Sequence, residues 1–508
     1  MAWKKNLVFC AALIICSSLA GSIASADDQP QWGEKHSRNM VSSEIQLVDD
    51  FDLATGKNVK WKAPLGDQTW STTIIAKGKV FIGTNNNPPR NQRQKGDRGI
   101  LLCLNEKDGA FLWQLSVPKL GPDPYLDWPQ TGLVSPVTVE GDRVYIVSNR
   151  DEVMCLDIDG LSNGNDGPYR DEGRHMGLGE GNTIEVSATD ADIIWLYDIP
   201  NQAGTYPHDG AHGSILIDGD FLYVNTSNGV DNTHKKIRAP QGPSLIALDK
   251  KTGRLLARDQ EGIGPNIFHS TWSSPALGEV NGRKLIFFGG GNGVVYAFEA
   301  LDSMPPEGTV ATLKKVWSFD CDLTAPKENI HEYLRNRKEG PSNIKGMPVF
   351  YENRVYIAVG GDIWWGKNKA WLKCIDATKR GDITSSGLIW SVDLRQHCCT
   401  TPAIANGLVF IADCDGVVHC LDAKTGETYW THETREEIWA SPMVADGKVY
   451  IGTRQRNFLE LTANREKKVI SEIRLDSPIA GTATPANGAL YVATMKTLYA
   501  LQKQSDGK

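Results

Sequence analysis

The chain has 508 residues, of which 61 are acidic and 54 are lysine or arginine, so its formal net charge at pH 7 is −7. A hydrophobic content of 40% and a charged content of 23% are typical of a folded globular protein, and they exclude a wholly disordered chain or a polytopic membrane protein. The acidic balance argues against nucleic-acid binding, which needs a basic face. The 50 glycines and 15 tryptophans favour a turn-rich β protein.

The first 26 residues have the pattern of a secretory signal peptide. Lys4 and Lys5 give a positive start, an apolar run follows over residues 7–20, and Ala24-Ser25-Ala26 supplies the small residues of a cleavage site. The apolar run is short and interrupted, and no later segment reaches the roughly 20 apolar residues that span a bilayer. We therefore expect an exported protein with no transmembrane segment after signal removal. Its final place would be the periplasm, the outer membrane surface or the extracellular space.

Eight short β runs with a central aromatic residue recur along the chain. Turns rich in Gly, Asn and Asp precede the runs, as in hairpins. A third strand follows each run, and its third residue is Ala or Cys in seven of the eight cases. A fourth strand often carries a tryptophan. The aromatic residues at the centres of the runs are Phe81, Tyr145, Tyr223, Phe287, Tyr356, Phe410, Tyr450 and Tyr491.

Four strands repeated eight times predict an all-β fold, an eight-bladed β-propeller of four-stranded antiparallel blades. The last repeat ends with a third strand, whereas Val59-Lys60-Trp61 forms an unpaired fourth-strand motif near the N-terminus. Pairing the two would close the ring and remove two sheet edges. We therefore divide the chain into a signal peptide (1–26), an N-terminal extension (27–49) and one propeller (50–505), expected to be a monomer. Four third-strand cysteines are expected to be small buried residues: Cys103, Cys155, Cys374 and Cys420.

The turn between the third and fourth strands of the sixth repeat carries the most specific motif. Residues 420–430 read Cys-Leu-Asp-Ala-Lys-Thr-Gly-Glu-Thr-Tyr-Trp. This motif resembles the PQQ-type repeat with its tryptophan-docking turn, which occurs in quinoprotein alcohol dehydrogenases and in BamB-type outer-membrane assembly proteins. The resemblance covers roughly residues 50–505. It implies the fold but little about activity, because the repeated residues dock neighbouring blades.

The candidate ligand site is the face of the propeller that receives most of the long insertions. These insertions span residues 85–99, 118–133, 201–213, 229–244, 322–346 and 360–370. A mouth lined with Trp and His suits a planar aromatic ligand, a sugar or a peptide, although the same side chains could simply plug the central channel. Inner-strand starts at this face carry Trp70, Trp128, His212, His269, Trp272, Cys398, Cys399 and Trp439.

The resemblance to quinoproteins implies PQQ and calcium as candidate cofactors. Asn228 matches an asparagine that helps to hold calcium in that family, but the glycine expected before Thr226 is replaced by Asn225. The loop where the family carries its catalytic aspartate reads Phe-His-Ser-Thr-Trp-Ser over residues 268–273 and contains no Asp. Glu152 lies in the wrong sequence setting for the calcium-binding glutamate. The dehydrogenase set is therefore incomplete, because a missing base removes the acid–base contribution.

Cys398 and Cys399 are adjacent, and in quinoprotein alcohol dehydrogenases an adjacent-cysteine disulfide lies against the quinone. The hairpin turn at Asn406-Gly407 also places Cys399 opposite Cys414. A vicinal disulfide, a cross-strand disulfide between Cys399 and Cys414, and three free thiols therefore all remain open. Disulfides are compatible with an exported protein.

One segment offers hard oxygen ligands in a turn, as calcium prefers. It departs from the EF-hand spacing and lacks the closing glutamate, so a polar surface turn is the competing interpretation. We find no His-rich metal motif and no Ser-His-Asp set in the sequence. The candidate calcium ligands are Asp157, Asp159, Asn163, Asn165 and Asp166.

Three functional hypotheses follow from a complete repeat with an incomplete catalytic set. The first is an exported propeller that acts as a binding or assembly scaffold in the cell envelope, without catalysis, with an envelope protein or a small ligand as partner. The second is a divergent PQQ-dependent alcohol or sugar dehydrogenase. The third is a carbohydrate-binding propeller. Residues assigned to a ligand or cofactor at the mouth are Trp70, Asn228, His269, Trp272, Cys398, Cys399 and Trp439.

Overall fold

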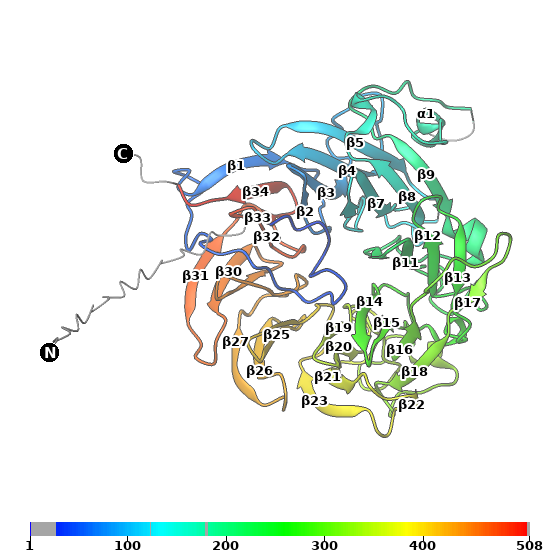
Figure 1. Cartoon of the computed structure of the whole chain (residues 1–508), viewed down its shortest axis with the longest axis vertical. Helices are drawn as coiled ribbons and strands as arrows, with labels where there is room; N and C mark the ends of the chain where they lie inside the picture. The colour runs from blue at the N-terminus through cyan, green and yellow to red at the C-terminus, as the bar shows by residue number, and fades with distance from the viewer. Residues whose placement is uncertain (2–26, 122, 178–180, 505–508) are drawn as a thin grey trace.

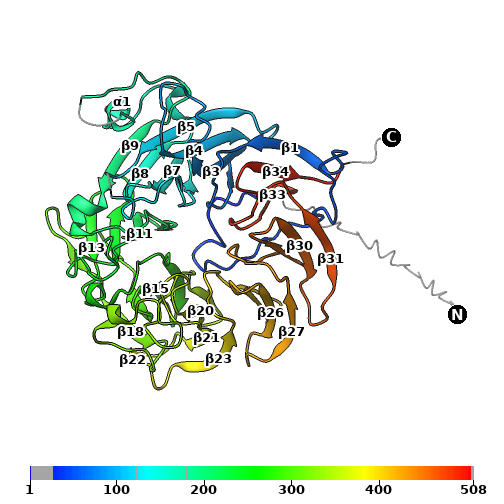
Figure 2. The same cartoon turned by 180° about the vertical axis from the view of Figure 1, so that it is seen from behind.

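The computed structural model describes residues 1, 27–121, 123–177 and 181–504, so the predicted signal peptide lies outside the described residues apart from Met1. Eight β-sheets are arranged in a ring around a central axis (Figure 1), and the same ring is seen from behind in Figure 2. The predicted eight-bladed β-propeller is therefore confirmed. No helix among the described residues is long and apolar enough to cross a membrane.

The first four blades run in chain order from residue 74 to residue 320, and each begins with a short inner strand. The first blade contains β2 (Ile74–Ala76), β3 (Lys79–Asn85), β4 (Arg98–Asn105) and β5 (Phe111–Pro118). The second contains β6 (Thr138–Glu140), β7 (Arg143–Val147), β8 (Glu152–Asp157) and β9 (Ile193–Asp198). The third contains β10 (Leu216–Asp218), β11 (Phe221–Asn225), β12 (Leu245–Asp249) and β13 (Leu255–Arg258). The fourth contains β14 (Ala276–Val280), β15 (Arg283–Gly289), β16 (Val294–Glu299) and β18 (Lys315–Asp320).

The last four blades repeat the pattern and end at residue 501. The fifth blade contains β19 (Val349–Tyr351), β20 (Arg354–Gly360), β21 (Ala370–Asp376) and β23 (Leu388–Leu394). The sixth contains β24 (Ala403–Ala405), β25 (Leu408–Ala412), β26 (Val417–Asp422) and β27 (Thr428–Glu433). The seventh contains β28 (Met443–Ala445), β29 (Lys448–Gly452), β30 (Asn457–Thr462) and β31 (Val469–Arg474). The eighth contains β32 (Thr484–Ala486), β33 (Ala489–Ala493), β34 (Thr497–Leu501) and β1 (Val59–Pro64).

Two sheets gain a fifth strand, which the repeat pattern did not predict. β17 (Ala311–Thr312) pairs in parallel with β13, and β22 (Gly381–Asp382) pairs in parallel with β18. Each extra strand comes from the next blade and so links neighbouring blades at their outer edge. The short helical turns are η1 (Gly160–Ser162), α1 (Glu172–His175), η2 (Pro200–Gly204), η3 (Gly264–Asn266) and η4 (Ile330–Tyr333).

The ring closes as the sequence predicts. β1 pairs antiparallel with β34, and Trp61 lies opposite Ala500. The first β-strand of the chain therefore completes the sheet formed by the last three strands. This pairing covers two backbone edges that would otherwise be exposed.

A layered arrangement of side chains explains the repeated Ala or Cys of the third strand. Cys103 lies opposite Phe81 on one side and Trp113 on the other. The small side chain leaves room for the two aromatic rings to meet with centroids 6.0 Å apart. Cys374 and Cys420 occupy the same position in later blades, and all four third-strand cysteines are buried free thiols, as predicted.

The tryptophans of six outer strands dock six of the eight blades, each on the next one. Each indole N–H donates a hydrogen bond to a backbone carbonyl in the turn between the third and fourth strands of the following blade. The close approach also requires glycine in several of these turns, because a Cβ atom at Gly426 would lie 2.8 Å from the Trp390 ring. The donor–acceptor pairs are Trp61 with Glu106, Trp113 with Ile158, Trp195 with Lys250, Trp317 with Ala377, Trp390 with Ala423 and Trp430 with Asn464.

The N-terminal extension runs through the centre of the ring, where the dark-blue trace crosses it in Figures 1 and 2. The sequence gives no repeat or periodic signal for this placement. Inner strands of a propeller leave one edge unpaired toward the axis, and the extension supplies partners for these edges. It hydrogen-bonds in or beside the inner strand of every blade. The pairs are Gln29 with Ile75, Pro30 with Val139, Arg38 with Ser214, His36 with Leu277, Ser37 with Phe350, Asn39 with Ile404, Met40 with Val444 and Glu44 with Asn487.

Arg38 is the most deeply buried charge of this extension, with 0% exposure. Its guanidinium donates to the carbonyl oxygens of Pro275, Trp32 and Ser214 and to the Ser214 hydroxyl. Burial lowers the pKa of Arg38 to about 9, so it remains charged at neutral pH. The side chain therefore ties the extension to the inner strands of the third and fourth blades.

Candidate functional site

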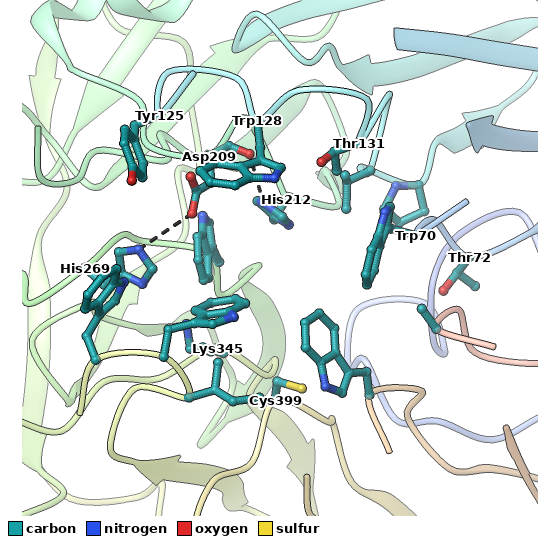
Figure 3. A pocket seen from close by; sticks show the side chains of 18 of the residues that line it. Trp70, Thr72, Tyr125, Trp128, Thr131, Asp209, His212, His269, Lys345 and Cys399 are labelled. Carbon is teal, nitrogen blue, oxygen red and sulfur yellow. Dashed lines mark hydrogen bonds and ion pairs between the residues drawn. The ribbon is translucent and has the colours of Figure 1, made fainter. Parts of the chain in front are cut away.

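The candidate site is a cavity of about 460 Å³ at the centre of the ring (Figure 3). Loops between blades and loops within blades both contribute to its wall, and Trp32 of the N-terminal extension also contacts it. Seven of the fifteen tryptophans line it, which separates them from the six that dock the blades. The seven are Trp32, Trp70, Trp128, Trp272, Trp364, Trp365 and Trp439.

The long insertions build most of this cavity, as their position in the repeat predicts. Five of the six insertions contribute residues that line the cavity. The remaining insertion, residues 85–99, contributes none of the described lining residues. Loops on a rigid scaffold commonly carry function in this way. The contributed side chains include Tyr125 and Trp128, Asp209 and His212, His234, Lys345, and Trp364 with Trp365.

Aromatic rings in mutual contact run along one side of the cavity. Trp70 and Trp439 have ring centroids 5.3 Å apart, and Trp439 meets Trp364 at 5.8 Å. Trp364 contacts Trp272 at 5.9 Å, and Trp272 contacts His269 at 5.0 Å. These edge-on and tilted contacts hold the rings at fixed orientations, so the wall is largely preformed.

Two cations lie over this aromatic wall. The guanidinium carbon of Arg454 is 4.4 Å from the ring centroid of Trp70 and 5.4 Å from that of Trp439, and Lys345 lies over two other rings. The ammonium nitrogen of Lys345 is 3.9 Å from the ring centroid of Trp272 and 4.8 Å from that of Trp364. It also forms an ion pair of 2.8 Å with Asp362, which is fully buried. Burial alone would raise the pKa of Asp362, but Lys345 and His269 hold it well below its usual range. Asp362 is therefore a carboxylate that neutralises Lys345.

Three histidines converge beside this aromatic wall, where His269 contacts Trp272 and Trp364. One side-chain nitrogen from each of His208, His234 and His269 lies within 4.8 Å of the other two. All three residues are buried, and burial lowers the pKa of His234 to about 4. Burial and the other two histidines lower the pKa of His208 well below its ordinary value. His208 and His234 are therefore uncharged at neutral pH.

Asp209 lies beside this cluster and points toward His269 in Figure 3. Its Oδ2 atom is 3.7 Å from Nε2 of His208 and 3.6 Å from Nε2 of His269. Burial raises the pKa of Asp209 to about 6, against the opposing effects of His269 and Lys345. Burial lowers the pKa of the neighbouring His212 to about 4, so that imidazole is neutral and contacts the Trp272 ring.

The structure brings together five of the seven residues that the sequence assigned to a ligand or cofactor. Trp70, His269, Trp272, Cys399 and Trp439 all line the cavity. Their role in binding stays a prediction. The remaining two, Asn228 and Cys398, are buried outside the described lining.

The geometry of the two residues considered for calcium does not fit a quinone–calcium site. The Asn228 side-chain oxygen accepts a hydrogen bond from the backbone N–H of Tyr206, and its amide donates to the Ala239 carbonyl. Glu152 accepts a hydrogen bond from Ser148 and forms a 3.0 Å contact with His175. Both side chains are engaged within the protein, and neither belongs to the residues that line the cavity.

The adjacent cysteines point to different partners. The thiol of Cys398 donates to the Ala412 carbonyl at 3.4 Å and is buried. The sulfur of Cys399 lines the cavity and lies 3.5 Å from the sulfur of Cys414. Of the three arrangements open from the sequence, the structure has free thiols with Cys399 placed beside Cys414.

The proposed calcium turn follows β8 and lies away from the central cavity. Asp157 accepts hydrogen bonds from the Asp159 backbone and the Asn163 amide, and it also pairs with Arg143. Asn165 contacts Glu172, while Asp166 is held through its backbone by Asp192. Protein groups thus already contact the residues of this turn through side chains or backbone, and calcium binding there stays a prediction.

Sequence reasoning missed several side chains of the cavity. Lys345 and Trp364 lie in insertions that were identified only as long loops. His208 and His234 come from loops that are separate in sequence from the one carrying His269, so no spacing motif connects the three. The segment Tyr-Pro-His-Asp-Gly-Ala-His over residues 206–212 was the available signal, since it concentrates polar side chains in an insertion.

Comparisons with known proteins support the expected resemblance. The family model described as outer membrane protein assembly factor BamB matches residues 368–505. The dehydrogenase subunit of the quinone-dependent alcohol dehydrogenase of Gluconobacter oxydans (strain 621H) is 26% identical over 183 residues, which cover 32% of this chain and 20% of that protein. The chain thus spans a fifth or less of the length of the curated relatives it matches.

Solved structures extend the likeness over most of the ring. BamB from Moraxella catarrhalis superposes with a TM-score of 0.52 at 13% identity, covering 88% of this chain and 98% of that chain. A europium-containing methanol dehydrogenase superposes with a TM-score of 0.57 at 12% identity, covering 92% of this chain and 89% of that chain. At such low identity the superpositions show a shared propeller fold, which both scaffold proteins and dehydrogenases use.

Proposed function

We propose that this chain is an exported propeller that binds a small molecule with a flat, largely apolar face in its central cavity. The observation that carries the proposal is the cavity of about 460 Å³ lined by seven tryptophans. Small-molecule sites commonly have volumes of about 300–1,000 Å³ and mainly apolar walls. An exported location is supported by the pattern of residues 1–26 and by the match to a model named for an outer membrane assembly factor.

Two exposed tryptophans favour entry of a ligand over a closed plug. Trp128 is 44% exposed and Trp364 is 42% exposed, although both line the cavity. Leaving large apolar rings in water is unfavourable, and clustered exposed aromatics commonly mark a binding surface. A ligand stacked on these rings would remove their faces from water.

The charges of the wall restrict the chemistry of the ligand. Among the described residues that line the cavity, Lys345 is the one lysine or arginine. Asp362 already neutralises its charge. A multiply charged anion would therefore find little compensation for the loss of its hydration. A planar aromatic compound or a sugar ring fits better, because both offer an apolar face for stacking and a few polar groups for Lys345 or Asp209.

Two other roles remain as alternatives within this proposal. The likeness to BamB supports a scaffold role toward an envelope protein. We identify no residue of the described surface that would contact such a partner. The dehydrogenase alternative is weakened by Asn228 and Glu152, whose side chains are engaged elsewhere. We therefore place ligand binding without quinone chemistry first.

The test is a titration of purified mature protein with a panel of neutral sugars, planar aromatic compounds, and PQQ with calcium. Intrinsic tryptophan fluorescence and thermal stability are recorded together. We expect at least one sugar or aromatic compound to quench fluorescence and raise the melting temperature, because its binding buries the wall tryptophans. The Trp439→Ala variant should lose this response, whereas Trp371→Ala should retain it, since Trp371 lies outside the described lining.

Three outcomes would overturn the proposal. If only PQQ with calcium produces saturable binding, followed by dye reduction with an alcohol, the dehydrogenase alternative replaces it. If no compound of any class changes fluorescence or stability in the wild-type protein, the cavity does not serve as a small-molecule site. A signal equally lost in both tryptophan variants would also place binding elsewhere.

A further inference from the structure

We propose that His208, His234 and His269, with Asp209, form a transition-metal site in the wall of the central cavity. One ligand nitrogen from each histidine lies within 4.8 Å of the others. The three side chains come from three separate loops, and the imidazole rings meet with centroids between 4.7 and 5.3 Å apart. Such convergence of metal-binding groups is what a coordination site requires.

Hydrogen bonds fix which nitrogen is available on two of the histidines. Nδ1 of His208 donates to the Val230 carbonyl at 2.7 Å, so its Nε2 atom carries the free lone pair. Nδ1 of His269 lies 2.9 Å from the Asp362 carboxylate, which orients the ring in the same way. A carboxylate or carbonyl behind each imidazole is the usual outer partner of a metal-bound histidine.

Several buried polar atoms in the cluster lack hydrogen-bond partners. This observation is independent of the short distances between the histidine nitrogens. Within the described part of the chain, Nε2 of His208, Nε2 of His269 and Oδ1 of Asp209 have no hydrogen-bond partner. The two histidines are 0% and 1% exposed. Leaving such atoms unpaired costs about 1–3 kcal/mol each. A cation bound between the two Nε2 atoms would satisfy both of these acceptors at once, and Oδ2 of Asp209 lies beside them.

The distances suit coordination after a small closure. A tetrahedral zinc ion at about 2.1 Å from each nitrogen places its ligand atoms about 3.4 Å apart. Oδ2 of Asp209 is already 3.7 Å from His208 Nε2 and 3.6 Å from His269 Nε2. The nitrogen–nitrogen separations among the three histidines, at most 4.8 Å, and the approach of Asp209 to His234 would also have to shorten to complete the set.

The donor set indicates the class of metal. Imidazole nitrogens favour zinc, cobalt, nickel or copper, whereas calcium and magnesium prefer oxygen ligands. Three histidines and one carboxylate therefore point away from calcium. The loop in which quinoproteins carry their catalytic aspartate instead carries His269 here, so the chain differs from those enzymes in the chemistry of this wall.

The metal would face the cavity. Asp209, His234 and His269 line it, while His208 is buried behind them. If the proposed function holds, an oxygen of the bound ligand could complete the coordination of the metal, which would give the ligand a fixed orientation on the tryptophan wall. The metal site itself does not depend on that ligand.

The test uses the mature protein dialysed against a chelator and titrated with cobalt(II) alone, without any organic ligand. Cobalt(II) bound by nitrogen ligands gives a visible absorption spectrum that reports its coordination. We expect one equivalent to bind with intense tetrahedral bands, and we expect zinc to displace it. The variants His208→Ala and His269→Ala should each weaken binding by about 100-fold or more, which is at least the loss known for outer-shell changes.

The control His432→Ala removes an imidazole that lies on β27, outside the cluster. It should bind cobalt as the wild-type protein does. Far-UV circular dichroism and the melting temperature of each variant establish that it is folded, and the double variant His208→Gln with His269→Gln keeps side-chain volume if an alanine variant is unstable. Absence of stoichiometric binding in the wild-type protein, or binding that survives in a folded double variant, would overturn the proposal.

The same experiment separates this inference from the proposed function. Trp439→Ala should bind cobalt normally even though it loses the organic ligand. A protein that binds cobalt but no compound of the panel would support the metal site and contradict the proposed function. The reverse result would contradict the metal site alone.

Discussion

The sulfur atom of Cys399 lies 3.5 Å from the sulfur atom of Cys414, across the hairpin that begins the sixth blade. The two residues flank β24 and β25, and the hydrogen bond between the Cys414 backbone N–H and His397 keeps the ends of the hairpin together. A disulfide needs a sulfur–sulfur distance of about 2.05 Å, so a small rotation of the side chains would be enough to join them. Cys398, by contrast, is held by the Ala412 carbonyl.

Mild oxidation is therefore expected to link Cys399 to Cys414 and to leave Cys398 free. Cleavage on the N-terminal side of aspartates separates Cys414 from the adjacent pair, so mass spectrometry of the fragments identifies the bond. Cys414→Ser should abolish the linked fragment, and Cys398→Ser should not. A fragment with a bond between Cys398 and Cys399 in the wild-type protein would contradict this account.

The docking of tryptophan rings predicts that alanine substitutions at two similar turn glycines destabilise the protein by different amounts. Gly426 and Gly407 have positive φ angles of 76° and 74°, so alanine strains the backbone of both turns by about 1 kcal/mol. At Gly426 the added Cβ would also lie 2.8 Å from the Trp390 ring, whereas nothing lies within 4 Å at Gly407. We expect Gly426→Ala to be less stable than Gly407→Ala by about 1–3 kcal/mol, measured by denaturant unfolding. Equal stability of the two variants would show that docking does not depend on this contact.

The buried guanidinium of Arg38 predicts that the N-terminal extension stabilises the ring. Arg38→Ala would leave the carbonyls of Pro275 and Ser214 without partners in a buried place. The expected loss in the free energy of unfolding is about 2–4 kcal/mol, measured by denaturant titration. Arg93→Ala is the matched control, because Arg93 is exposed and pairs only with Glu185 among the described residues. A loss no larger than that of the control would mean that the extension contributes little to the fold.

Glu460 predicts a pH dependence of stability. Its side chain is buried on β30, and burial raises its pKa to about 8 from its ordinary value of 4.5. Between these two pH values the unfolded chain loses the proton while the folded chain retains it, so stability falls as pH rises. Melting temperatures at pH 5 and pH 8 should therefore differ less in Glu460→Gln than in the wild-type protein. Glu466→Gln, at an exposed position, should behave as the wild type does, and an unchanged pH profile in Glu460→Gln would refute this assignment.

The fold could be predicted because its signals are local and repeated. Each aromatic run, each small third-strand residue and each docking tryptophan recurs within one blade. Cys103 illustrates why: its size is set by Phe81 and Trp113, which are its direct cross-strand neighbours. Ring closure followed from the unmatched strand around Trp61.

The site could be predicted only in outline. The tryptophans at inner-strand starts have a fixed place in the repeat, so Trp70, Trp272 and Trp439 were found from sequence. The histidine cluster and Lys345 come from insertions that follow no repeat, and their meeting depends on loop conformation. The path of residues 27–49 depends on backbone pairing with inner strands, which is independent of side-chain periodicity.

The most direct test of the central cavity as the functional site is a crystal structure of the mature protein with the strongest compound of the panel. We expect ligand density inside the cavity, stacked on Trp364 or Trp272 and within reach of Lys345. Density at the outer surface of the blades, with the tryptophan wall unchanged and bare, would contradict it.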